Sequence, residues 1–121
     1  MTENSKILDR IYSVIENRKG NNPASSYTAH LLSQGMPEIA RKLGEEAIET
    51  ITAALTAENK NIVAESADLL FHLLVLWSEK GITPEEVWAE LVRREGTSGI
   101  EEKAARPANR SVKGRLDHDK L

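Results

Sequence analysis

The sequence predicts an all-α fold, an antiparallel helical bundle of about five helices. Apolar residues recur with the period of a helix, glycine and proline fall between the periodic segments, and no segment alternates convincingly as a strand does. A chain of 121 residues fits one domain. We expect that domain over residues 1–106, followed by a basic and possibly flexible C-terminal extension over residues 107–121.

The first two helices are indicated by spacing and capping. Residues 7–15 carry apolar side chains at the spacing of an amphipathic helix, and Gly20 follows as a stop. After a loop, Ser25 or Ser26 can cap a short helix that runs through Leu32. These two segments are therefore predicted to form the N-terminal part of the bundle.

The third and fourth helices form the centre of the predicted bundle. The third starts at Pro37, a residue that suits the first helical position, and runs to about Ala57. Residues 59–61 are a short polar break, and the fourth helix follows from roughly Asn61 to Lys80. Because the break is short, the two helices are expected to lie antiparallel.

The fourth helix is apolar nearly all round between residues 69 and 77. A helix of that kind is buried on all sides. In so short a chain a second copy is the expected source of the extra cover. We therefore expect a homodimer formed through this helix.

The last predicted helix begins with a capping box. Thr83 is followed by Pro84 at the first helical position and by Glu86 at the third. The helix ends near Gly96, and beyond it the periodicity fades. The sequence thus predicts little regular structure after this point.

Composition narrows the class of protein. The chain has no cysteine, which excludes disulfides and thiolate metal sites and favours a cytoplasmic setting. A net charge of −3 does not support nucleic-acid binding. The apolar stretch at 67–77 contains Asp68 and His72 and is too short to span a membrane. Basic residues gather between Lys103 and Leu116, either as a solvated tail or as an arm that meets an anion.

Two acidic clusters lie on the third and fourth predicted helices. Glu45, Glu46 and Glu49 share one helix face, and Glu65 and Asp68 share another. Like charges at this spacing repel each other, so these acidic residues do not stabilise their helices. In an antiparallel pair the two clusters stand at comparable distances from the connecting break. They can therefore meet at one level of the bundle.

Such a meeting of carboxylates would suit a magnesium ion, which prefers oxygen ligands and keeps waters for a substrate. The ion could hold a polyphosphate, and a spare carboxylate could take a proton from the attacking water. The alternative is a set of solvated acidic residues on helix surfaces. Asp68 argues against that alternative, because its apolar neighbours predict burial, and a buried carboxylate needs a partner.

Four segments resemble a known family. Residues 42–49 read K-L-G-E-E-A-I-E and residues 65–74 read E-S-A-D-L-L-F-H-L-L. They resemble the E-E-x-x-E and E-x-x-D signature of the MazG-like all-α nucleotide pyrophosphohydrolases. Residues 26–32, S-Y-T-A-H-L-L, and residues 94–103, R-E-G-T-S-G-I-E-E-K, narrow the resemblance to the phosphoribosyl-ATP pyrophosphatases of histidine biosynthesis. It extends to about Arg106.

The resemblance implies hydrolysis of phosphoribosyl-ATP to phosphoribosyl-AMP and pyrophosphate, with magnesium, in a cytoplasmic dimer. The cyclohydrolase of the next step would be a separate chain. By position, the implied metal ligands are Glu46, Glu49, Glu65 and Asp68, and Glu45 is the candidate for water activation or a second metal. The substrate-binding candidates are Lys42, Tyr27, Arg94, Lys103 and Arg106.

Several residues also have plain structural interpretations. His72 is one turn beyond Asp68 and is more readily explained as a core or interface histidine than as a partner of the Asp68 carboxylate or an acid. Tyr27 can anchor the short second helix. Arg94 lies at a helix end, where positive charge suits the helix dipole.

Two rival functions stay open at this point. One is a house-cleaning pyrophosphatase of the same superfamily that acts on free nucleoside triphosphates. The segments at 26–32 and 94–103 argue against it, whereas the acidic motifs do not exclude it. The other is a non-catalytic helical module that binds a partner through the apolar fourth helix. Metal dependence would separate that module from an enzyme.

Overall fold

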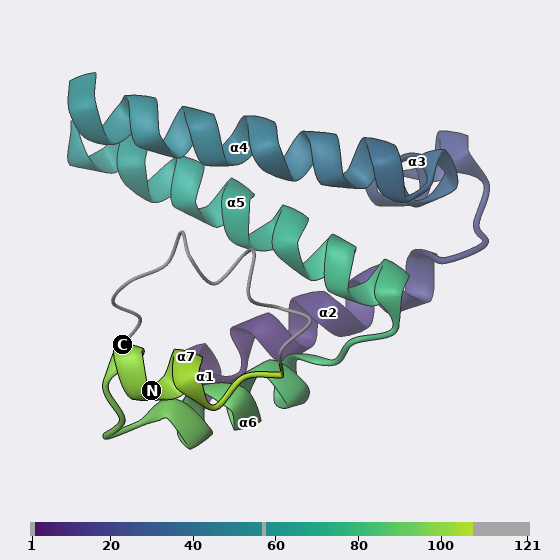
Figure 1. Cartoon of the computed structure of the whole chain (residues 1–121). Helices are drawn as coiled ribbons and strands as arrows, with labels where there is room; N and C mark the ends of the chain where they lie inside the picture. Colours follow the sequence, from purple (N-terminus) through teal and green to yellow (C-terminus); the bar gives the residue numbers. More distant parts are fainter. Residues whose placement is uncertain (1, 57, 108–121) are drawn as a thin grey trace. The chain divides into compact units, whose positions relative to one another are not determined.

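The computed structural model describes residues 2–56 and 58–107, in which all regular structure is helical (Figure 1). No strand occurs in these two ranges, so the predicted all-α class is confirmed. The helices are α1 (Thr2–Ser5), α2 (Ile7–Arg18), the 3-10 helix η1 (Pro23–Ser25), α3 (Tyr27–Gln34), α4 (Met36–Thr56), α5 (Asn59–Lys80), α6 (Pro84–Arg94) and α7 (Gly99–Ala104).

The five predicted helices correspond to α2 through α6. Ser26 is the N-cap of α3, and its side chain accepts a hydrogen bond from the backbone N–H of Ala29 at 3.0 Å. The short helices α1, η1 and α7 were not expected. A signal for α7 was present, because Ser98 followed by Glu101 is a capping-box pattern, and Ser98 does accept from the Glu101 N–H at 3.1 Å.

The chain divides into two compact units, one up to Pro84 and one from Glu85 onward, and each is described by itself. The expected single domain over residues 1–106 stays a prediction. The C-terminal extension predicted over residues 107–121 lies, apart from Pro107, outside the described residues.

The first unit is built around the hairpin of α4 and α5. The two helices run side by side in opposite directions, as the short polar break predicts (Figure 1). Gly81 ends α5 in a left-handed conformation with φ 76°, which glycine adopts without the strain that a side chain brings. The antiparallel hairpin therefore sets the two acidic segments opposite each other.

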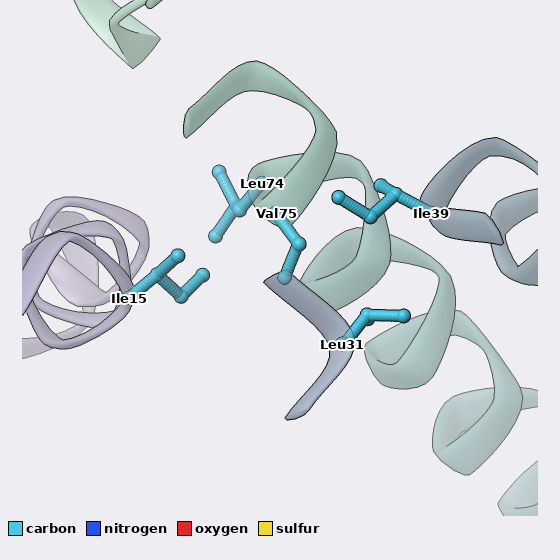
Figure 2. Packing of buried hydrophobic residues seen from close by; sticks show 5 residues of the cluster. All are labelled: Ile15, Leu31, Ile39, Leu74 and Val75. Carbon is cyan, nitrogen blue, oxygen red and sulfur yellow. The ribbon is translucent and has the colours of Figure 1, made fainter. Parts of the chain in front are cut away.

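The core of the first unit lies between α2, α3 and one end of the hairpin. Figure 2 shows side chains from four helices converging there: Ile15, Leu31, Ile39, Leu74 and Val75. All five are buried. Ile39 is near the start of α4 and Leu74 is near the end of α5, so this core secures the end of the hairpin away from its loop.

A hydrogen-bonded group of polar residues fastens α2 to the last turns of α5. The hydroxyl of Ser78, a fully buried residue, donates to Glu16 Oε2 at 2.6 Å, and Lys19 Nζ donates to the Ser78 carbonyl at 2.7 Å. The hydrogen bond from Ser78, with a second from Lys19, lowers the pKa of Glu16. The buried hydroxyl and the main-chain carbonyl of Ser78 are thus each satisfied by a charged partner.

The other half of the hairpin has a large exposed apolar surface. Its exposed apolar residues, which we call the hairpin apolar face, are Ile48, Ile51, Leu55, Val63 and Leu70. Leu55 is 78% exposed and Val63 is 68% exposed. A single chain therefore leaves part of the fourth predicted helix uncovered, and the expectation that a second copy covers it stays a prediction. Periodicity shows that a surface is apolar, but the neighbours decide whether it is covered.

By length and composition alone, α5 could cross a membrane, since its most apolar window has a mean hydropathy of 1.2. One such helix is weak evidence, because the core helix of a folded protein passes the same test. In this structure α5 packs against α2 and α4 and supplies two residues of the core.

Candidate functional site

Three carboxylates meet where α4 and α5 face each other. Glu46 and Glu49 are three residues apart on α4 and share a face, and Glu65 comes from α5. Each offers an oxygen, and these oxygens all lie within 4.8 Å of one another. We call this group the carboxylate cluster. The antiparallel hairpin thus brings the two acidic segments together as the spacing predicts.

Thr50 ties the two helices together at this level. Its hydroxyl lies 2.8 Å from the main-chain oxygen of Glu46 and 3.2 Å from the main-chain oxygen of Glu65. A hydroxyl has a single hydrogen, so the two carbonyls share it. Thr50 was not predicted as a site residue from the sequence. Its position one turn after Glu46, on the same helix face, was the available signal.

The carboxylate cluster is under electrostatic stress. Glu46 is 7% exposed, and the Oε1 atoms of Glu46 and Glu65 are buried without a hydrogen-bond partner among the described residues. Burial raises the pKa of Glu65 above its usual value, and the hydrogen bond with Glu49 and the negative charge of Glu49 raise it further. Unpartnered buried carboxylate oxygens are costly, so the site needs a positive charge.

The donor set of the carboxylate cluster fits a hard divalent cation. Its ligands are all carboxylate oxygens, which such ions prefer over nitrogen and sulfur. Exposed acidic groups often converge without binding an ion. The two buried Oε1 atoms distinguish this group from such a surface, because nothing else in the described chain satisfies them. The cluster could therefore hold a metal ion.

Glu45 lies beside the carboxylate cluster but has other partners. Its carboxylate pairs with Arg41 and accepts a hydrogen bond from Lys42 Nζ at 3.1 Å. The hydrogen bond from Lys42 lowers the pKa of Glu45, with a further contribution from the charge of Arg41. Lys42 also lies 3.9 Å from Glu46 Oε2, so Glu45 holds a cation against the edge of the cluster.

Asp68 is placed differently from our expectation. It is exposed, so the inference that its apolar neighbours bury it is wrong for the described chain. Its carboxylate is not among the converging oxygens of the cluster. It is still close enough that its charge contributes to raising the pKa of Glu65, one turn earlier on α5.

His72 and Tyr27 form a hydrogen-bonded pair near the site. His72 is buried, its Nδ1 lies 2.8 Å from the main-chain oxygen of Asp68, and its Nε2 lies 2.8 Å from the Tyr27 hydroxyl. The interpretation of His72 as a core histidine with satisfied hydrogen bonds is therefore confirmed. Its partner is the main chain of Asp68, not the carboxylate.

An open hollow of about 310 Å³ adjoins the carboxylate cluster. Its lining includes Glu49 and Glu65 and continues toward the hairpin loop past Thr52, Thr56 and Asn61. Hydroxyl and amide groups therefore border the acidic residues on this side. A polar ligand attached to a metal-bound group would find donors and acceptors here.

Two of the predicted substrate-binding residues of the second unit, Arg94 and Arg106, are engaged in ion pairs. Glu102, which is 2% exposed, accepts a hydrogen bond from Arg93 Nη2 at 2.7 Å and another from Arg106 Nε at 2.9 Å. Arg94 Nε donates to Glu90 Oε2 at 2.9 Å and lies 3.6 Å from Glu102 Oε2. We call Glu90, Arg93, Arg94, Glu102 and Arg106 the ion-pair cluster. Lys103 is partly exposed and follows Glu102 in the short helix α7.

The ion-pair cluster differs from the substrate-binding role expected of Arg94 and Arg106. Hydrogen bonding by Arg106 lowers the pKa of Glu102, and hydrogen bonding by Arg93 lowers the pKa of Glu90 to about 2. The arginines thus hold α6 and α7 together within the second unit. A substrate phosphate would compete with Glu90 and Glu102 for them. Arg94 also lines a cavity of about 440 Å³ with Leu91, Val92, Glu95 and Gly96.

Comparison with known proteins adds an independent line of evidence. A family model described as "Phosphoribosyl-ATP pyrophosphohydrolase" matches residues 8–95. A protein of Paramagnetospirillum magneticum named "Phosphoribosyl-ATP pyrophosphatase" is 56% identical over 106 residues, which is 88% of this chain and 97% of that protein.

Relatives with the same name occur in other bacteria. The Geobacter metallireducens protein is 53% identical over 107 residues, covering 88% of this chain and 98% of its own length. The Gluconobacter oxydans protein is 50% identical over 101 residues, covering 84% of this chain and 76% of its own length. The similarity therefore covers the hairpin and its carboxylate cluster.

Proposed function

Because this chain belongs to the phosphoribosyl-ATP pyrophosphohydrolase family, we propose that it hydrolyses phosphoribosyl-ATP to phosphoribosyl-AMP and pyrophosphate, a step of histidine biosynthesis. The family match at residues 8–95 includes every member of the carboxylate cluster. The observation that carries the proposal is that cluster, whose buried oxygens need a cation. Water attacks a phosphorus of the triphosphate, and the α–β anhydride bond breaks, so the reaction needs no further reactant.

We assign Mg²⁺ as the ion, because it prefers oxygen ligands and commonly bridges polyphosphates in enzymes. Glu46, Glu49 and Glu65 would hold it, and Asp68, one turn beyond Glu65, would complete the set. When bound, the ion neutralises charge on the substrate and polarises the phosphorus that is attacked. These carboxylates, from α4 and α5, would hold the ion.

The residues around the cluster take supporting roles. Lys42, held by Glu45 at the edge of the cluster, would contact a phosphate oxygen of the substrate. Glu45 was the candidate for water activation, but a lowered pKa makes it a weaker base. We therefore assign Glu45 to holding Lys42 in place. Arg94, Lys103 and Arg106 stay candidates for substrate phosphates, in competition with the acids of the ion-pair cluster.

The working form proposed here is a cytoplasmic homodimer. The hairpin apolar face leaves Leu55 78% exposed and Val63 68% exposed, and a second copy would cover such surfaces. Light scattering of the full chain should give the mass of two copies. Replacing Leu55 and Val63 by glutamate should give one copy, and an unchanged dimer would mean that another face is used. We expect the cyclohydrolase of the next step on a separate chain.

A substrate panel tests the proposal against its rivals. Purified protein would be given phosphoribosyl-ATP, ATP, dCTP and an oxidised deoxyguanosine triphosphate, each with Mg²⁺, and pyrophosphate release would be measured. We expect phosphoribosyl-ATP to be turned over with a kcat/KM at least about 100-fold above that of any free triphosphate. Faster turnover of a free triphosphate would favour the house-cleaning enzyme. No pyrophosphate from any substrate, together with Mg²⁺-independent thermal unfolding, would favour the non-catalytic module.

A further inference from the structure

His72 bridges the α5 main chain and Tyr27, a contact that reaches across 45 residues of sequence. The ring is 6% exposed and packs edge-on against Phe71, with ring centroids 5.2 Å apart. Tyr27 is 49% exposed, and its ring meets the His72 ring edge-on at 5.8 Å. The buried ring of His72 thus forms a hydrogen bond with the hydroxyl of the half-exposed Tyr27.

The hydrogen bonds define which atoms donate. The main-chain oxygen of Asp68 can only accept, so Nδ1 of His72 must carry a hydrogen. In a neutral ring Nε2 is then an acceptor, and the Tyr27 hydroxyl, 2.8 Å away, donates its only hydrogen to it. The Tyr27 oxygen therefore has lone pairs left but no hydrogen for a second bond.

Tyr27 lies near the carboxylate cluster, because its partner His72 bonds the main chain of Asp68, one turn beyond Glu65 on α5. Burial raises the pKa of Tyr27, the positive charge of Lys42 lowers it, and the charges of Glu46, Glu45 and Glu38 raise it again. The net rise keeps the phenol protonated, as the hydrogen bond to His72 requires. The phenol therefore lies within electrostatic range of the proposed phosphate contact Lys42 and of the buried member of the cluster.

We infer, resting on the proposed function, that His72 is a positioning residue. By accepting the hydrogen of the Tyr27 hydroxyl, it leaves the Tyr27 oxygen able only to accept a hydrogen bond from the substrate. Phosphate oxygens of a nucleotide need donors, so they are poor partners for such an oxygen. The substrate groups that suit it are the hydroxyls of its ribose units, which can donate. Tyr27 would therefore contact a sugar, and Lys42 beside it would contact phosphate. His72 itself touches no substrate.

A kinetic double-mutant cycle tests whether His72 acts through Tyr27. The variants are Tyr27→Phe, which keeps the ring, His72→Leu, which removes the acceptor, and the two combined. Each single change should lower kcat/KM for phosphoribosyl-ATP by about 5- to 20-fold, mainly through KM. The double variant should be no worse than the poorer single one. His72→Gln, whose amide oxygen can accept from Tyr27, should recover most of the loss.

The outcome that overturns the inference is multiplication of the two losses, or single variants that change thermal stability without changing kcat/KM. The melting temperature of every variant shows whether a loss of kcat/KM comes from a lost contact with the substrate or from a destabilised fold. If the wild-type protein itself releases no pyrophosphate, the proposed function fails, whereas failure of this inference is visible only between variants.

A second measurement does not depend on activity. Nitrogen-15 NMR of the full chain at neutral pH reports which ring nitrogen of each histidine carries hydrogen. The His72 signals, assigned by their loss in His72→Gln, should show hydrogen on Nδ1 and a hydrogen-bonded acceptor at Nε2. Tyr27→Phe should shift the Nε2 signal and leave Nδ1 protonated. A ring with hydrogen on Nε2, or an Nε2 signal that ignores Tyr27→Phe, would refute the arrangement.

Discussion

The carboxylate cluster of the first unit and the ion-pair cluster of the second unit use the same acidic side chain in opposite ways. In the second unit Glu102 is almost fully buried and is surrounded by three arginines. In the first unit the buried Oε1 atoms of Glu46 and Glu65 have no hydrogen-bond partner in the described chain. The negative charge of Glu102 is balanced by arginines of the same chain, whereas the carboxylate cluster requires a cation from outside the chain.

The pKa values follow this difference. Hydrogen bonding by arginine lowers the pKa of Glu90 to about 2, whereas burial and the neighbouring Glu49 raise the pKa of Glu65. A cluster whose negative charges are balanced by arginines of the same chain contributes to stability. A cluster that costs stability is retained for a ligand, and this is the physical basis for placing the metal in the first unit.

The largest expected effect comes from removing one member of the carboxylate cluster. Glu49→Gln should lower kcat/KM for phosphoribosyl-ATP by at least about 100-fold, because a metal ligand is lost. In metal-free buffer the same variant should unfold at the wild-type temperature or above it, since repulsion falls. Asp68→Asn should lose less, about 10-fold, because Asp68 lies outside the cluster. Full activity of both folded variants would show that these carboxylates do not form the metal site.

The complementary change in the ion-pair cluster should affect folding. Glu102→Gln removes the buried negative charge that pairs with Arg93 and Arg106, so the melting temperature should fall. Glu101→Gln is the matched control, because Glu101 is an exposed neighbour in the same first turn of α7. Differential scanning calorimetry gives both values. Equal melting temperatures for the two variants would mean that the ion-pair cluster does not contribute to the stability of the fold.

The two clusters should also respond to pH with opposite signs. The pKa of Glu90 falls from 4.5 to about 2 on folding, so its stabilisation is present above pH 4.5 and is lost as the pH falls toward 2. The pKa of Glu65 is raised above 4.5, so its destabilisation is absent below pH 4.5 and develops as the pH rises through the raised pKa.

Urea unfolding in a chelator, from about pH 3 to about pH 7, measures both effects. The stability advantage of the wild type over Glu90→Gln should shrink toward acid. The advantage of Glu65→Gln over the wild type should grow toward neutral pH. The same pH trend in both comparisons would contradict the contrast between the clusters.

The smallest effect is expected at Thr50. Thr50→Val removes the hydroxyl shared by the Glu46 and Glu65 carbonyls and should cost about 1 kcal/mol of unfolding free energy, with a few-fold loss of activity. Ser33→Ala is the control, because that exposed hydroxyl bonds back to the His30 carbonyl within α3. If both substitutions change activity equally, Thr50 has no special role in spacing the helices.

Local patterns were enough to predict the hairpin and the meeting of its acids. Glu46 and Glu49 share a face because of their spacing, and the short break before α5 leaves an antiparallel return as the simple path. Opposed faces at matched distances from a loop must then meet. These are properties of a few adjacent turns, which a sequence displays directly.

Burial and long-range pairing were harder to predict. The apolar neighbours of Asp68 suggested burial, yet its own face is open in this chain. Glu101 and Glu102 look alike in the sequence, and only packing decides that the second is buried among arginines. The bond between Tyr27 and His72 likewise depends on how α3 meets α5, which no local pattern encodes.

The most direct test of the central claim is pyrophosphate release from phosphoribosyl-ATP by metal-stripped protein, measured before and after Mg²⁺ is added. We expect no release above background in chelator, rapid release once Mg²⁺ is present, and no such recovery for Glu49→Gln. Equal release with and without Mg²⁺, or recovery in Glu49→Gln to the wild-type rate, would contradict the claim that the carboxylate cluster is the metal site of the reaction.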